Sequence, residues 1–276
     1  MPDTPGSLIR HAAVAACLIL VLLAGAARAG AQAPGPQPIA GPAGDSPEFL
    51  SRYDFQLSAA ALAVDDERFT WDTHFGGTLD LVDYVRGRAS MVADYEAVLG
   101  SEFRPFDPNQ ASYTLEGSSS VWAGRTEIAG VFSHVSRHLG DRPKRAAIAW
   151  NVLGARVLRQ FSLGSTTLGV RVGAGRIVAH AIVDYGWTAD FDLVARRSLK
   201  QHIGTYARVS GEAFGIDSAL SQRHTQSGGR VEAGVRVDGR AGAVELFAGF
   251  ERRVDADPFD RLPLHWALVG FRLVNK

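Results

Sequence analysis

From about residue 50 onward, apolar and polar residues alternate with a period of two. The segment 69–83 shows the alternation most clearly, and its apolar parity consists of Phe69, Trp71, Thr73, Phe75, Gly77, Leu79 and Leu81. The intervening positions are Thr70, Asp72, His74, Gly76, Thr78 and Asp80. A helix would mix these two sets, whereas an extended strand separates them. The pattern therefore predicts a β-strand with one apolar and one polar face.

The same alternation recurs and predicts about twelve strands. We place them near 52–64, 69–83, 87–99, 111–123, 126–138, 146–159, 166–178, 180–194, 202–214, 228–238, 243–254 and 264–273. Short links such as 124–125 alternate with longer ones such as 100–110 and 215–227. Short turns at one end and long loops at the other are typical of outer-membrane barrels. The links near 65–68 and 179 are shorter than this rule expects for outer loops.

The fold class expected is all-β: a single antiparallel transmembrane β-barrel of about twelve strands, following a signal peptide. A soluble β-sandwich is the alternative, in which the apolar faces would form a core. The strands are longer than is usual in soluble sheets, and the small residues of their apolar faces suit a lipid-facing band. Trp71, Trp150, Tyr185 and Trp187 are then expected to form interfacial girdles.

The opposite face of these strands carries charges of both signs. Its acidic residues are Asp94, Glu96, Glu116, Glu127, Asp184, Asp190, Glu212, Glu232, Glu245 and Glu251. Its arginines are Arg88, Arg171, Arg208, Arg230, Arg236 and Arg253. Opposite charges in a confined space pair with one another, so we expect a narrow, charge-paired lumen. His74 is expected to be a hydrogen-bonding residue of this lumen rather than a metal ligand.

The first residues indicate export to the bacterial outer membrane. Arg10 and His11 precede an apolar run followed by small residues, which predicts a signal peptide over 1–31. Residues 32–50, rich in Ala, Gly, Pro and Gln, read as a flexible periplasmic lead-in, and 51–276 as the barrel. The single cysteine, Cys17, lies inside the apolar run, so neither lipidation nor a disulfide in the mature chain is expected.

Composition narrows the possible partners. Acidic and basic residues balance at 29 each, and no basic surplus points to nucleic acid. The glycine-rich stretch 169–175 lies in a predicted strand without a following helix and is not a phosphate loop. No cofactor or metal is expected. Outer-membrane lipids are the expected partners, and a homo-oligomer is left open.

One segment carries candidate chemistry, at the outer end of the fifth predicted strand. His134, Ser136 and His138 share the lipid-facing side of that strand. A histidine and a serine two residues apart on a strand have Cα atoms about 7 Å apart. An imidazole can then take the hydroxyl proton, which is the core of Ser-His nucleophilic catalysis. His134 and His138 lie about 13 Å apart on an extended strand, too far to share one metal ion.

At His134-Val135-Ser136 the chain resembles outer-membrane phospholipase A and the lipid A deacylases, which carry H-x-S near the outer rim. Phospholipase A is also a twelve-stranded barrel. The longer H-x-S-x-H-L-G-D sequence, residues 134–141, resembles the signature of an uncharacterised family of bacterial exported proteins. The resemblance to the hydrolases implies an outer-leaflet lipid esterase, whereas the resemblance to the uncharacterised family implies no known activity.

The chain departs from the hydrolase pattern in two places. Arg137 follows the motif where an Asn is usual, and Ile148 stands where an orienting Asn or Glu is expected on the next strand. Asn151 is close by, but its expected strand parity is opposite and reaching the site needs a bulge. Asp141, in the following loop, is the other candidate to orient His134.

Two functional hypotheses follow. The first is a non-enzymatic barrel with a structural, adhesive or narrow-channel role, in which the three polar side chains are rim residues that contact lipid headgroups. The second is an outer-leaflet lipid esterase. It uses Ser136 as nucleophile, His134 as base and either Asp141 or Asn151 as the orienting residue, with His138 beside them.

Overall fold

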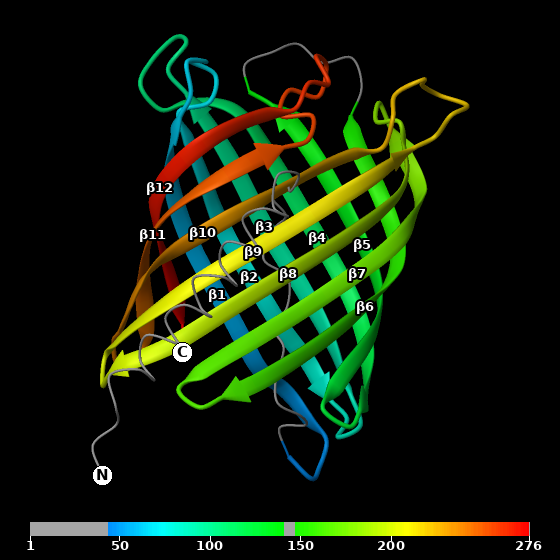
Figure 1. The fold of residues 1–276 in the computed structure, drawn as a ribbon. Coiled ribbons are helices and arrows are strands. Elements are labelled where there is room, and N and C mark those ends of the chain that lie inside the picture. Colours follow the sequence, from blue (N-terminus) through cyan, green and yellow to red (C-terminus); the bar gives the residue numbers. More distant parts are fainter. Residues whose placement is uncertain (1–43, 141–146, 276) are drawn as a thin grey trace, which may run out of the picture.

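The computed structural model describes residues 44–140 and 147–275, which form a closed antiparallel barrel (Figure 1). Each strand pairs with its neighbours in sequence, and the last strand pairs with the first. The strands are β1 (Glu48–Ala63), β2 (Trp71–Asp83), β3 (Arg88–Gly100), β4 (Asp107–Ala123), β5 (Thr126–Leu139), β6 (Ile148–Leu163), β7 (Thr166–Ala181), β8 (Tyr185–Lys200), β9 (Ile203–Ile216), β10 (Gln226–Asp238), β11 (Gly242–Arg253) and β12 (Leu264–Asn275).

This architecture confirms the predicted twelve-stranded barrel, with every predicted strand in its place. The largest boundary differences are at β8, which spans Tyr185–Lys200 rather than 180–194. It begins later because β7 continues to Ala181. The expected signal peptide, 1–31, lies outside the described residues, as does most of the expected lead-in, 32–50. No helix in the described ranges has the length and hydropathy needed to cross a membrane.

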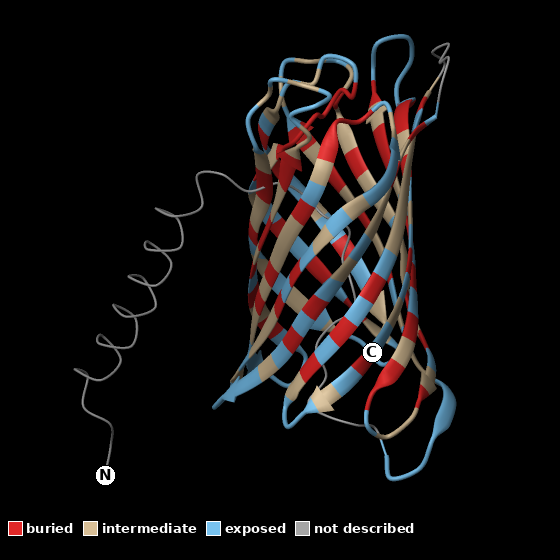
Figure 2. Ribbon diagram, turned by 90° about the vertical axis from the view of Figure 1, so that its right-hand side faces the viewer, coloured by how far each residue is buried: buried red, intermediate tan, exposed pale blue. Residues whose placement is uncertain are grey.

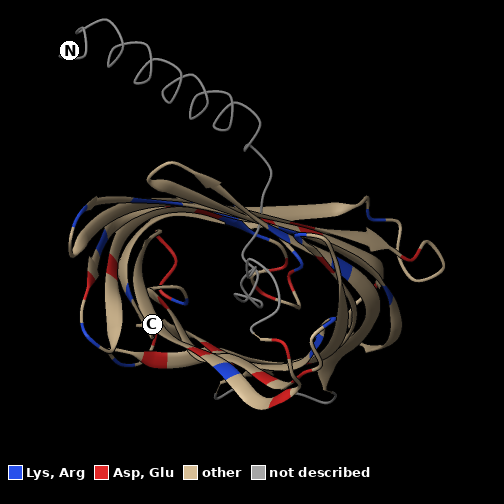
Figure 3. Cartoon of the chain, turned by 90° about the horizontal axis from the view of Figure 1, so that it is seen from below, with Lys and Arg blue, Asp and Glu red and all other residues tan. Residues whose placement is uncertain are grey.

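The barrel is apolar outside and polar inside. Buried and exposed positions alternate along the strands (Figure 2), as a pleated sheet closed into a barrel requires. Large side chains such as Phe75, Leu115 and Phe132 are exposed on the exterior. Acidic and basic residues occur all around the wall (Figure 3), and many of their side chains are buried. An apolar exterior around a polar interior is the arrangement of a transmembrane barrel.

Ion pairs cross-link the lumen as the sequence pattern predicts. Arg88 binds Asp80 and Glu127, each at 2.8 Å, and all three side chains are buried. Further pairs join Arg208 to Asp192 and Arg272 to Glu232, both at 2.7 Å. Because each of these buried charges has an opposite charge within bonding distance, the paired residues stiffen the interior rather than form a single-sign pore lining.

The two ends of the barrel differ. Links of two to four residues, such as 84–87, 124–125 and 201–202, close one end, where β1 begins and β12 ends. Longer links, such as 217–225 and 254–263, lie at the other end (Figure 1), where the three-residue link 182–184 is an exception. In outer-membrane barrels the short turns are periplasmic and the long loops extracellular. The outer end of β5, with Leu139, is therefore at the extracellular rim.

The β11–β12 loop, 254–263, folds inward and covers the outer mouth; we call it the plug loop. Asp255 is 4% exposed, and its carboxylate accepts hydrogen bonds from Tyr185 Oη at 2.7 Å and from Arg223 at 3.1 Å. Gln110 of β4 donates to the Ala256 carbonyl at 2.7 Å. Hydrogen bonds from β4, β8 and the 217–225 link hold the loop in place, so the loop packs over the outer end of the lumen.

Packing against the plug loop overturns three expectations about aromatic residues. Trp150 and Tyr185 were expected in the lipid-facing girdle but are 7% and 4% exposed and pack with Phe214 and Val254 inside the barrel. A register shift between β8 and β9 separates Tyr185 from Trp187, so that only Trp187 of the two is exposed. Phe69, expected to face lipid, is fully buried before β2 begins and stacks on Trp266 at 5.7 Å.

Candidate functional site

Strand β5 brings the motif residues to the outer rim on the exterior face. It alternates buried Glu127, Ala129 and Val131 with exposed Ile128 and Phe132, and His134, Ser136 and His138 continue the exterior parity. The side chains that flank Ser136 in register are Tyr113 of β4 and Ala149 of β6. The motif therefore lies on the lipid-facing surface, as the alternation predicts.

The structure brings Asn151 to His134, and the parity expected for Asn151 was wrong. In the β5–β6 register His134 pairs directly with Asn151, whereas Ile148 pairs with Arg137 and is fully buried. Directly opposed residues of an antiparallel pair project from the same face, so no bulge between β5 and β6 is needed. Asn151 Oδ1 lies 2.6 Å from His134 Nδ1.

This contact determines the chemistry of the imidazole. An amide oxygen only accepts hydrogen bonds, so His134 Nδ1 carries the proton and donates it to Asn151 Oδ1. In a neutral imidazole Nε2 is then unprotonated and can act as a base. The contact with Asn151 thus fixes the Nδ1-protonated tautomer of a neutral His134 and leaves Nε2 available to accept a proton.

Ser136 is hydrogen-bonded to the second histidine. Its Oγ lies 3.2 Å from His138 Nε2, and His138 packs edge-to-face on Tyr113 with ring centroids 5.4 Å apart. The hydroxyl therefore lies between two imidazoles of one strand face. Rotation about the Cα–Cβ bond of Ser136 would move its Oγ away from His138 and toward His134.

An apolar groove of about 660 Å³ opens beside these residues on the exterior. It crosses the outer faces of β1 to β5, four strand spacings or roughly 19 Å. Two aromatic pairs lie along it, Phe55 with Phe75 at 5.4 Å and Tyr95 with Tyr113 at 5.0 Å between ring centroids. Its end at β5 is formed by His134, Ser136 and His138. The groove thus leads along an aromatic surface to the serine.

Arg137, which stands where the hydrolases usually have an Asn, contacts the plug loop in this chain. It lies on the opposite parity to Ser136, and its Nη1 donates to the backbone oxygen of Asp255 in the plug loop at 2.8 Å. Its guanidinium also lies over the Trp150 ring, 5.9 Å from the centroid. The residue between Ser136 and His138 therefore ties this strand end to the plug loop. Asp141, the other expected orienting residue, lies outside the described residues.

Sequence reasoning missed the groove. Tyr95 and Tyr113 were assigned only to apolar strand faces, and the signal that would have grouped them is their cross-strand register, Tyr95 opposite Tyr113 and Tyr113 opposite Ser136. That register depends on loop lengths and bulges, which alternation within single strands does not reveal.

Comparisons with known proteins support the architecture. No protein-family model matches the chain, and no curated protein matches it by sequence. Among solved structures, the Salmonella typhi outer membrane phospholipase, a dimer with bound calcium, is similar over 83% of this chain and 92% of its own, at 11% identity and a TM-score of 0.51. Outer membrane phospholipase A from Escherichia coli is similar over 84% and 98%, at 11% identity and a TM-score of 0.50.

A further similar structure is LpxR from Salmonella typhimurium, with 7% identity, a TM-score of 0.48, and coverage of 80% of this chain and 99% of that one. At such identities the likeness concerns the fold. Together with the apolar exterior and polar interior, it defines the class: the chain is an outer-membrane β-barrel of twelve strands.

Proposed function

We propose that this barrel is an outer-leaflet lipid acyl hydrolase, with Ser136 as nucleophile, His134 as general base and Asn151 as the residue that orients His134. The observation that carries the proposal is the 2.6 Å contact between His134 Nδ1 and Asn151 Oδ1. His134 lies two residues before Ser136, on the same lipid-facing side of β5 at the rim. Two of the solved structures that share this fold are outer membrane phospholipases, which supports the proposal.

The proposed reaction is ester hydrolysis in two steps. Ser136 Oγ attacks the ester carbonyl while His134 Nε2 accepts the hydroxyl proton, and His134 then returns that proton to the departing alcohol oxygen. Water, deprotonated by the same imidazole, attacks the acyl-serine, and the fatty acid leaves as Ser136 recovers its proton. Asn151 keeps Nε2 directed toward the serine throughout.

The surroundings of the serine fit a lipid substrate. The apolar groove offers an aromatic surface on which an acyl chain can lie while its ester reaches the rim. Because the groove opens to the membrane rather than to water, the substrate need not leave the outer leaflet. In this proposal the lipid that surrounds the barrel is also the substrate.

The decisive experiment compares purified, folded protein with Ser136→Ala on mixed micelles of phospholipid and, separately, of lipid A, with released fatty acid as the readout. Ser133→Ala is the matched control, because Ser133 lies on the same strand with the lumen-facing parity. We expect Ser136→Ala to lose at least about 10³-fold in turnover, since the nucleophile is absent, and Ser133→Ala to keep wild-type turnover. Equal turnover by Ser136→Ala and wild type would refute the proposal.

A second candidate function rests on the bond between Ser136 and His138. If that bond persists, the rim cluster is a polar contact for lipid headgroups and the barrel is non-enzymatic. The two candidates differ in their response to His134→Ala, which abolishes hydrolysis in the first and changes no activity in the second. His265→Ala, an exposed histidine near the outer end of β12, controls for the loss of a surface imidazole.

A further inference from the structure

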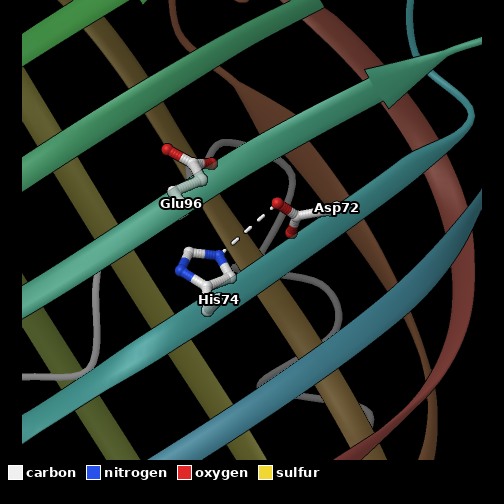
Figure 4. Close-up of side chains that lie close together, drawn as sticks. All are labelled: Asp72, His74 and Glu96. Carbon is white, nitrogen blue, oxygen red and sulfur yellow. Dashed lines mark ion pairs between the residues drawn. The ribbon is translucent and has the colours of Figure 1, made fainter. Parts of the chain in front are cut away.

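A cluster of chemically versatile side chains lies inside the barrel, apart from the rim site. Asp72 and His74 project into the lumen from β2, and Glu96 joins them from β3, directly opposite His74 in the register (Figure 4). Donor atoms of the three side chains lie within 4.8 Å of one another. Nothing in the proposed hydrolysis uses them.

The arginines beside this cluster leave one oxygen of each carboxylate available. Asp72 Oδ2 contacts both neighbours, Arg230 at 3.0 Å and Arg253 at 3.3 Å. Its Oδ1 is buried, accepts no hydrogen bond among the described residues, and lies 3.4 Å from His74 Nε2. Arg253 likewise contacts Glu96 through Oε1, at 2.8 Å. The oxygen of Asp72 turned away from the arginines therefore faces the imidazole nitrogen.

His74 is oriented as a ligand histidine usually is. Its Nδ1 lies 3.1 Å from Asp94 Oδ2, and since a carboxylate accepts, Nδ1 donates and carries the ring proton. Its Nε2 faces Asp72 Oδ1 in an ion pair at 3.4 Å (Figure 4), and a cation bound there would take the place of the Nε2 proton. A histidine whose second nitrogen donates to a carboxylate is the common second-shell arrangement of metal sites, where it fixes the tautomer and strengthens the ligand.

The local charge favours a cation. Four carboxylates meet two guanidiniums here, namely Asp72, Asp94, Glu96 and Glu251 with Arg230 and Arg253. Glu232, which Arg230 also contacts, has Arg272 at 2.7 Å. With His74 protonated between Asp72 and Asp94, the cluster keeps one negative charge, and a divalent cation that replaces the Nε2 proton would leave the cluster neutral.

Space for additional ligands is present. The cavity that His74, Asp94 and Glu96 line has a volume of about 140 Å³, enough for waters that complete a coordination shell. Residues of β11 and of the plug loop, Arg253 and Val254, form part of the same cavity wall. A cation bound there would lie just beneath the loop that covers the outer mouth.

We propose that Asp72 Oδ1, His74 Nε2 and a Glu96 oxygen bind one divalent transition-metal cation of the zinc type inside the lumen. One imidazole nitrogen with two carboxylate oxygens suits such ions, whereas calcium and magnesium prefer an all-oxygen shell. Ligand atoms in a tetrahedral zinc site lie roughly 3.4 Å apart, so binding draws the three side chains slightly together. The bound cation joins β2 to β3 and stabilises the outer half of the barrel independently of the rim chemistry.

The test measures zinc bound to untagged, full-length protein folded in detergent and treated with EDTA. Zn²⁺ is added, excess is removed by gel filtration, and the metal content is measured by atomic emission. We expect about one zinc per chain in the wild type, and at least a ten-fold weaker affinity in His74→Gln and in Asp72→Asn. His134→Ala and Asp238→Asn, which change a rim histidine and a periplasmic-end carboxylate, should bind like wild type.

If a variant does not fold, X-ray absorption spectroscopy of the zinc-loaded wild type still identifies the atoms that bind the zinc. We expect a shell of nitrogen and oxygen with a single imidazole. Failure of the wild type to retain zinc, a shell with two or more imidazoles, or full binding by folded His74→Gln would overturn the proposal. Because His134→Ala removes hydrolysis but should keep zinc, failure of the enzyme proposal and failure of the metal proposal give different results.

Discussion

Replacing Asn151 with alanine removes the hydrogen bond that orients His134 among the residues the structure describes. The contact is short, at 2.6 Å, and both groups are half-buried at a lipid-facing rim where water competes poorly. The residue opposite His134 on the other side is Leu115, which has no polar group to replace the amide. The imidazole of the variant therefore rotates and changes tautomer freely.

The magnitude follows from the value of that bond. A hydrogen bond whose loss leaves a partly buried partner unsatisfied costs about 1–3 kcal/mol. Because the bond holds the base in its reactive orientation, this cost falls on the transition state and lowers kcat by roughly 5- to 150-fold. The groove is unchanged, so KM for the lipid should stay within about two-fold of wild type.

The assay measures initial rates of fatty-acid release from mixed micelles over a range of surface lipid concentration. Asn151→Asp is the informative companion, because a carboxylate accepts the same proton and should keep much of the activity. Asn275→Ala makes the same truncation at the periplasmic end and should leave both constants unchanged. Wild-type kcat in folded Asn151→Ala would refute the reasoning.

The remaining predictions concern the groove, the lumen and the plug loop. Phe75→Ala, which removes one ring of the Phe55–Phe75 pair, should raise KM about 2- to 10-fold with little change in kcat, as the kinetics on long-chain and short-chain esters will show. Arg156→Met leaves the buried Glu116 carboxylate unpaired and should lower the free energy of unfolding, measured by urea titration, by about 3–5 kcal/mol. The double variant with Glu116→Gln should recover most of that loss. An unchanged free energy of unfolding in Arg156→Met would contradict the pairing. The wild type should show no steady conductance in planar bilayers, whereas replacing 255–262 with a short glycine-serine link should open the outer mouth and produce measurable current; an equal current from both would show that the loop is no plug.

Much of the fold could be predicted because each strand obeys a local rule. A period of two requires only that one face meets lipid and the other meets polar groups, and β2, β3, β5 and β11 follow it along most of their length. The length asymmetry of the links then gave the orientation, and with it the rim position of Ser136.

The same rule was misleading where the lumen is apolar. In the outer part of β6, Ile148 and Trp150 face inward because they pack against Val254 of the plug loop, so an apolar side chain there does not indicate lipid. Taking Trp150 as exterior assigned Asn151 to the interior, so Asn151 could be proposed as the partner of His134 only with a bulge. A loop that folds back into its own barrel leaves no periodic signal, which is why neither the plug loop nor the direct pairing of Asn151 with His134 could be inferred.

The direct test of the central claim is covalent labelling of the serine. Folded wild-type protein is treated with a long-chain alkyl fluorophosphonate, which reacts with activated serine hydroxyls, and the modified peptide is identified by mass spectrometry. The account predicts one adduct, on Ser136, that is absent in Ser136→Ala and strongly slowed in His134→Ala. An unlabelled wild type, or equal labelling of wild type and His134→Ala, would contradict it.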